Sequence, residues 1–91
     1  MQDLRDIVAF KEQYSSKAAL NIVEKITQKF QTLAKFPSIG KPRSDLVTGI
    51  RSFPVEDYLI FYFPTEAGIE IARVVSGYRD LEALFVEVDD S

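Results

Sequence analysis

The stretch "YLIFYFPTEAGIEIARVVS", residues 58–76, decides the fold. Its first part, "YLIFYF" at 58–63, is rich in aromatic and branched side chains and is apolar at successive positions, which predicts a central strand buried on both faces. "PTEAG" at 64–68 predicts a turn, and "IEIARVVS" at 69–76 predicts the strand that returns. The stretch therefore predicts an antiparallel pair of strands, whose aromatic residues form sheet core rather than a surface for stacking bases.

The segment before this pair extends the sheet. "GIRSFPV" at 49–55 predicts a third strand, over about residues 50–55, in which Pro54 favours an edge or a bulge because proline has no N–H to donate. "FPSIGKPR" at 36–43 is rich in proline and glycine and predicts an irregular connector. Gly40 and Gly49 are expected to be turn glycines.

The N-terminal part of the chain predicts two helices. Residues 3–14 place apolar side chains near one face, with Asp3 as the cap, and serines at 15–16 cap a second helix over about 16–36. The second helix carries an apolar stripe with helical spacing: Ala19, Ile22, Val23, Ile26, Phe30, Leu33 and Ala34. So short a connection predicts an antiparallel helical hairpin, packed by its stripe on one face of an antiparallel sheet. The fold class is therefore α+β, in a single domain over residues 1–91.

Composition excludes several kinds of chemistry. The chain has no cysteine and no histidine, so disulfides, thiol nucleophiles, histidine bases and the usual zinc sites are excluded. We expect no cofactor and no metal, and the acidic tail "EVDDS" at 87–91 is expected to be solvated. No apolar run approaches the ~20 residues of a membrane span, and "MQDLRD" has no signal-peptide pattern. A cytoplasmic protein is expected.

Charge is distributed unevenly along the chain. Residues 1–40 carry six basic and four acidic side chains, whereas residues 41–91 carry five basic and ten acidic ones. Proteins that bind nucleic acid usually present a basic field, because phosphate contacts supply most of their affinity. The acidic second half therefore disfavours direct nucleic-acid binding.

The order of motifs resembles the ParE/RelE superfamily of type II toxin–antitoxin toxins, over residues 3–85. The blocks that carry the resemblance are "DLRDIVAF", "SSKAALNIVEKI", "LAKFPSIGKPR", "LVTGIRSFPVEDYLIFYF" and "IEIARVVSGYRDL". The resemblance is closer to ParE, whose members poison DNA gyrase by direct binding, than to RelE, whose members cut mRNA on the ribosome. Both kinds are held inactive by a cognate antitoxin encoded beside them. The resemblance therefore favours a toxin that acts by binding and is not an enzyme, and a RelE-like endoribonuclease is the alternative.

The chain departs from the family pattern at two places. Ser76 stands where family members often carry histidine, and only Met1 and Gln2 precede "DLRDI", where a first strand is usual. These departures also fit a non-toxic member that keeps antitoxin binding. Without a first strand, one sheet edge is expected to lie open. We expect the chain alone to be a homodimer or poorly soluble, and an antitoxin segment to cover that surface.

The resemblance implies a few candidate site residues. A ribonuclease would need Arg51, Arg73 and Arg79 to stabilise a phosphate, with Tyr78 as an acid or a stacking group. Arg51 and Arg73 are expected to approach each other across the sheet. The alternative, favoured by the ten acidic groups nearby, is that these arginines pair with carboxylates. In "GYRDL", Arg79 is expected to be exposed, with Tyr78 and Asp80, at a surface for the target or the antitoxin; an ion pair with Asp80 is the other reading.

Overall fold

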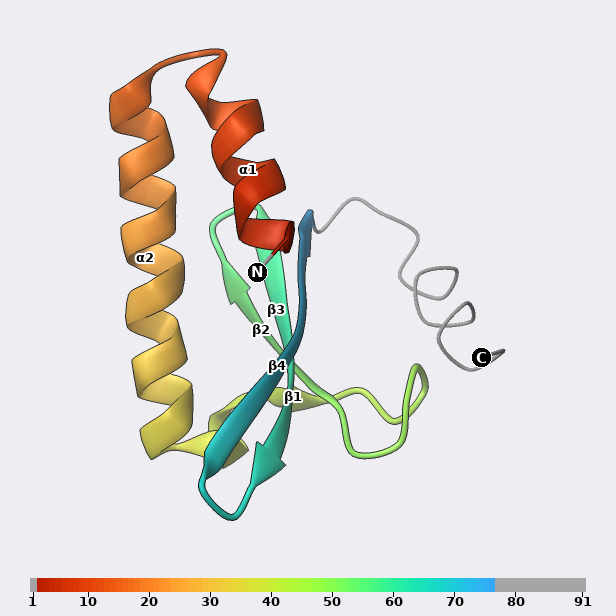
Figure 1. The fold of residues 1–91 in the computed structure, drawn as a ribbon. Helices are drawn as coiled ribbons and strands as arrows, with labels where there is room; N and C mark the ends of the chain where they lie inside the picture. Colours follow the sequence, from red (N-terminus) through yellow and green to blue (C-terminus); the bar gives the residue numbers. More distant parts are fainter. Residues whose placement is uncertain (1, 77–91) are drawn as a thin grey trace.

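The computed structural model, which describes residues 2–76, lays a helical hairpin against one face of an antiparallel sheet (Figure 1). The helices are α1 (Gln2–Glu12), α2 (Ser16–Lys35) and a short 3-10 helix, η1 (Pro37–Ile39). The strands are β1 (Lys41–Pro42), β2 (Arg51–Val55), β3 (Tyr58–Thr65) and β4 (Gly68–Ser76). They lie in the order β1-β2-β3-β4, each antiparallel to its neighbour. The predicted α+β fold is confirmed.

The apolar stripe of α2 packs on the sheet as predicted. Ser15 caps the helix, its Oγ accepting a hydrogen bond from the Ala18 N–H at 2.9 Å. One core cluster joins the two helices to β2, β3 and β4; its buried members are Ile7, Ile22, Ile26, Leu33, Val55, Tyr58, Ile60, Tyr62 and Val74. Each large side chain buried in this way contributes about 1.5–3 kcal/mol. The hairpin and the sheet therefore stabilise each other through one shared core.

The opposite face of the sheet has a smaller core of its own. Leu46 and Ile50, from the loop between β1 and β2, pack against Phe61 and Val75. Gly49 makes the tight turn of that loop with a φ of 84°, a conformation that favours glycine. Phe61 and Tyr62 are therefore both fully buried, on opposite faces of the sheet. This confirms that the aromatic run at 58–63 forms a central strand, β3, that is buried on both faces.

The connector at 36–43 is more regular than the sequence predicts. It contains η1 and the two-residue strand β1, which pairs Lys41 with Ser52 and Pro42 with Arg51. The sequence predicted three strands, and β1 is too short to show a period of its own. Because β1 covers only the first two residues of β2, Pro54 remains on the edge of the described sheet, as its missing N–H requires.

Position 40 requires glycine because the side chain of Tyr62 lies directly against it. The Tyr62 hydroxyl donates to the Pro37 carbonyl at 2.6 Å and accepts from the Gly40 N–H at 2.9 Å. A Cβ at position 40 would come within 2.7 and 2.8 Å of the ring atoms Cε1 and Cζ of Tyr62. The glycine is thus required by a close approach and not by a turn, since its φ is −71°.

The second outer strand, β4, has β3 as its strand neighbour, and no strand within residues 2–76 lies on its other side. Helix α1 begins beside this outer edge (Figure 1). Within the same residues, no helix is both long and apolar enough to cross a bilayer. The start of α1 therefore meets this side of β4, and the expectation of an open sheet edge stays a prediction.

Candidate functional site

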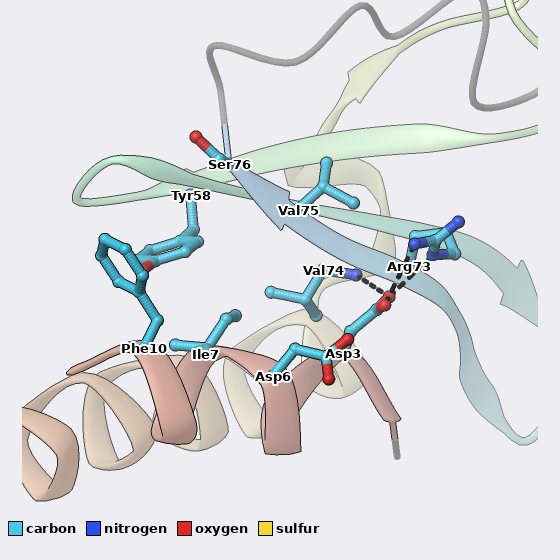
Figure 2. A pocket seen from close by; sticks show the side chains of 9 residues that line it. All are labelled: Asp3, Asp6, Ile7, Phe10, Tyr58, Arg73, Val74, Val75 and Ser76. Atoms are coloured by element: carbon cyan, nitrogen blue, oxygen red, sulfur yellow. Dashed lines mark hydrogen bonds and ion pairs between the residues drawn. The ribbon is translucent and has the colours of Figure 1, made fainter. Parts of the chain in front are cut away.

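The outer edge of β4 is bound by a carboxylate from the first turn of α1 (Figure 2). Arg73 donates from Nε and Nη2 to the two Asp3 oxygens at 2.8 and 3.1 Å, and the Val74 N–H donates to Oδ2 at 2.9 Å. The Asp3 side chain is only 13% exposed. A bidentate pair with a third, backbone donor is held more firmly than an exposed ion pair. These bonds fasten α1 to a strand that lies 70 residues further along the chain.

The direction of the Val74 N–H fixes the geometry of this edge. In an antiparallel ladder, alternate residues turn both backbone groups toward the neighbouring strand or both away from it. The Val74 N–H is directed at Asp3 and away from β3. At Val74, β4 therefore turns its backbone N–H toward α1, where the Asp3 carboxylate accepts it.

A cavity of about 400 Å³ lies between α1 and this edge. Figure 2 shows Ile7 and Phe10 projecting from α1 toward the β4 side of the cavity. Phe10 is 51% exposed, which is high for a large aromatic side chain beside a core. The full lining is Asp3, Asp6, Ile7, Phe10, Tyr58, Arg73, Val74, Val75 and Ser76. Two carboxylates and one guanidinium leave this lining acidic by one formal charge. We call it the β4-edge groove.

Arg51, the first residue of β2, binds the connector at residues 36–43. Its Nη1 donates to the Ser38 carbonyl at 3.2 Å and to the Gly40 carbonyl at 2.6 Å. Together with the Tyr62 hydroxyl, this guanidinium satisfies backbone groups that η1 leaves without helical partners. Among residues 2–76, Arg51 therefore bonds to carbonyls and not to a carboxylate.

Arg51 and Arg73 do not approach each other. They lie on β2 and β4, with β3 between them, and they bind to different segments of the chain. In register, Arg51 is opposite Tyr62 and Arg73 is opposite Phe61, with a register shift between these two residues of β3. The expectation that the two arginines meet across the sheet was wrong. Tyr78, Arg79 and Asp80 lie outside the described residues.

The structure gives Asp3 a role that differs from the one expected from the sequence. Its expected role was the cap of α1, but the helix begins at Gln2, so Asp3 lies in the first turn. A carboxylate is favourable there because of the helix dipole, and from there it reaches Arg73. The sequence signal was ambiguous, because an acidic residue near a helix start suits both roles. The partner of Arg73 therefore came from the opposite end of the chain.

Two exposed ion pairs account for other charged side chains. Arg43 donates to both oxygens of Asp45 at 3.1 and 2.9 Å, and this hydrogen bonding lowers the pKa of the Asp45 carboxyl. The hydrogen bond from Lys25 likewise lowers the pKa of the Glu56 carboxyl. Glu56 sits in the β2–β3 turn with a φ of 55°, an uncommon conformation for a residue with a side chain. Within residues 2–76, no group of acidic side chains is gathered closely enough to hold a metal ion.

Comparison with known proteins supplies the family. A family model described as the ParE toxin of the type II toxin–antitoxin system, parDE, matches residues 1–81. A curated protein, Toxin ParE3 of Caulobacter vibrioides, is 34% identical over 68 residues. That match covers 75% of this chain and 65% of the relative, so the chain spans less than two thirds of the relative's length.

Proposed function

The chain belongs to the ParE toxin family of type II toxin–antitoxin systems, and from this membership we propose that it is the toxin of such a module. A cognate antitoxin neutralises it, and it acts in the cytoplasm by binding a protein target, DNA gyrase. The Caulobacter relative bears a toxin name of the same family, which supports this assignment.

The observation that favours binding over RNA cleavage is the state of the two arginines that a ribonuclease would use. Arg73 is bonded to Asp3 and Arg51 to the carbonyls of the connector. A phosphate in a cleavage site needs converging cations that are not already neutralised, and a base and an acid beside it. The chain contains no histidine for that purpose. We therefore propose no catalytic residue.

Expression of the chain alone in bacteria tests the proposal. The expected result is growth arrest, with induction of a DNA-damage reporter and loss of plasmid supercoiling. Co-expression of the antitoxin encoded beside the gene should restore growth. Normal supercoiling during growth arrest would contradict the choice of gyrase, and growth without arrest would mark the non-toxic alternative.

Purified chain in a translating extract tests the ribonuclease alternative. We expect no mRNA cleavage above background. Cleavage that Arg73→Ala or Arg51→Ala abolishes would overturn the binding proposal, provided that circular dichroism shows folded variants. Arg43→Ala is the matched control, because it also removes a bonded arginine, but one on the exposed loop that pairs with Asp45.

A further inference from the structure

We propose that the chain contacts its protein target through the connector that follows α2, by inserting Phe36 and Ile39 into an apolar pocket of that folded partner. This rests on the proposed function, because that function supplies the partner, DNA gyrase. Phe36 is 60% exposed and Ile39 is 48% exposed. They lie at the opposite end of α2 from the turn that leads to α1 (Figure 1). We call residues 35–41 the connector surface, and none of them lines the β4-edge groove.

The short helix η1 brings the two apolar side chains together. The Ile39 N–H donates to the Phe36 carbonyl at 3.2 Å, which closes a turn from the first residue to the fourth. With three residues in each turn of a 3-10 helix, positions i and i+3 lie next to each other on one side. A single exposed apolar residue is ordinary, but two large ones side by side indicate a contact surface.

The backbone of the connector surface is held in place from the sheet. Arg51 on β2 and Tyr62 on β3 bind four of its backbone groups. These groups are the carbonyls of Pro37, Ser38 and Gly40 and the N–H of Gly40. A segment that is already ordered loses little conformational freedom on binding, so more of its contact energy becomes affinity. The sheet thus holds rigid a turn whose apolar side chains face solvent.

Charge defines the chemistry of the partner's surface. Residues 35–42 contain two lysines, Lys35 and Lys41, and no acidic side chain, in a chain of net charge −3. Both lysines are exposed, one on each side of the apolar pair in sequence. Charges at the rim of an interface guide association when the partner carries the opposite sign. The partner is therefore expected to present an apolar pocket rimmed by carboxylates. Two lysines are too few to hold nucleic acid, whose affinity comes mainly from many phosphate contacts.

The shape of the connector surface favours a folded partner over an extended peptide. Peptides lie in grooves or along strand edges, where their backbone finds hydrogen bonds. Here the four backbone groups named above are already bonded to Arg51 and Tyr62, so the surface offers side chains. Exposed side chains need a concave pocket, which a folded protein supplies. A second copy fits less well, because a symmetric pair would place Lys35 and Lys41 against the same lysines.

Inhibition of purified DNA gyrase in a plasmid supercoiling assay tests the apolar pair. Phe36→Ser and Ile39→Ser should each raise the concentration of chain needed for half-inhibition about tenfold, because each removes an anchor from the pocket. Leu20→Ser is the matched control, because Leu20 is 64% exposed on α2 and lies outside the connector surface. Its half-inhibition concentration should stay within about twofold of the native value.

The same assay tests the lysines. Replacing Lys35 and Lys41 together by glutamine should raise the half-inhibition concentration about threefold at low salt and less at high salt, because rim charges are screened. Lys17→Gln is the control, since Lys17 is also an exposed lysine of α2 but lies near its other end. It should inhibit as the native chain does.

Binding of the antitoxin separates a lost surface from a lost fold. Each variant should show native circular dichroism and should still co-purify with the product of the adjacent antitoxin gene. If Phe36→Ser fails to fold, Ile39→Ser and the lysine pair still decide the question. A folded Phe36→Ser variant that no longer binds the antitoxin would make the antitoxin the occupant of this surface and overturn the inference.

Three other outcomes also overturn it. Variants that inhibit gyrase as well as the native chain would remove the connector surface and leave the proposed function standing. Self-association of the native chain in sedimentation, abolished by Phe36→Ser, would make a second copy the occupant. Absence of inhibition by the native chain would contradict the choice of gyrase, and the inference with it. The last failure appears before any residue is changed, so it is distinguishable from a failure of the connector surface.

Discussion

Removing one buried hydroxyl should loosen the connector between the helices and the sheet. Tyr62→Phe keeps the ring in a fully buried position and deletes the atom that bonds both Pro37 and Gly40. The Gly40 N–H is buried, and a buried donor left without its partner costs about 1–3 kcal/mol. The Pro37 carbonyl is only partly buried, so water can replace part of its bond. We expect a loss of about 2 kcal/mol in the free energy of unfolding.

This loss is large enough to measure in a small domain. For a chain of this size, 1 kcal/mol shifts the melting temperature by about 4–8 °C, so Tyr62→Phe should lower it by about 8–16 °C. Urea unfolding followed by circular dichroism should show a lower midpoint with an unchanged slope, because the surface exposed on unfolding is the same. The Gly40 amide should also exchange faster with solvent.

Tyr14→Phe is the control, because Tyr14 is 72% exposed, and its change should stay within about 0.5 kcal/mol. The reasoning is refuted if Tyr62→Phe loses no more stability than this control. A changed urea slope would also contradict it, since that would indicate an altered denatured or native state and not a lost pair of hydrogen bonds.

Three further changes have expected outcomes. Gly40→Ala should cost about 1–3 kcal/mol in urea unfolding and should remain costly in a Tyr62→Phe background, because the ring atoms that the new Cβ meets are still there; a tolerated alanine would mean that the ring moves freely. The hydrogen bond from Lys25 lowers the pKa of the Glu56 carboxyl in the folded chain below its ordinary value of 4.5. On acidification the unfolded chain therefore binds a proton at Glu56 before the folded chain does. The pair with Lys25 adds stability above pH 4.5, and this stability is lost as the pH falls through the folded pKa. Lys25→Ala should flatten this acid dependence in urea melts between about pH 3 and 6, and an unaltered profile would assign it to other carboxyls. Arg79→Ala should change stability by less than about 0.5 kcal/mol while weakening binding of target or antitoxin; a large fall in melting temperature with unchanged binding would make Arg79 structural.

The sequence predicts those parts of the fold that depend on local pattern. The stripe of α2 has one repeating period over five turns of helix, and the aromatic run of β3 is flanked by turn residues, so both elements were predicted at nearly the right boundaries. The two-residue strand β1 has no period to detect, and it depends on pairing with Arg51 and Ser52. Its existence is a tertiary effect that the local sequence does not encode.

The candidate site depends on contacts that sequence spacing does not reveal. Arg73 was correctly placed in a strand, but its partner Asp3 is 70 positions away, and many nearer carboxylates fitted equally well. Within residues 2–76, Arg51 bonds to the carbonyls of Ser38 and Gly40 and not to a carboxylate. Charge counts along a chain thus do not identify the groups to which its arginines bond.

The bond between the two ends of the described chain has a consequence for the order of folding. The helical hairpin and the strand meander both join neighbours in sequence, whereas the bond from Asp3 to Arg73 closes a loop of 70 residues. Closing so long a loop is entropically costly until other contacts have formed, so this bond is expected to be absent from the folding transition state. Asp3→Ala should then speed unfolding in stopped-flow experiments and leave the refolding rate nearly unchanged. The bond between α1 and β4 would thus give the chain kinetic stability, because it slows unfolding and leaves the folding rate nearly unchanged.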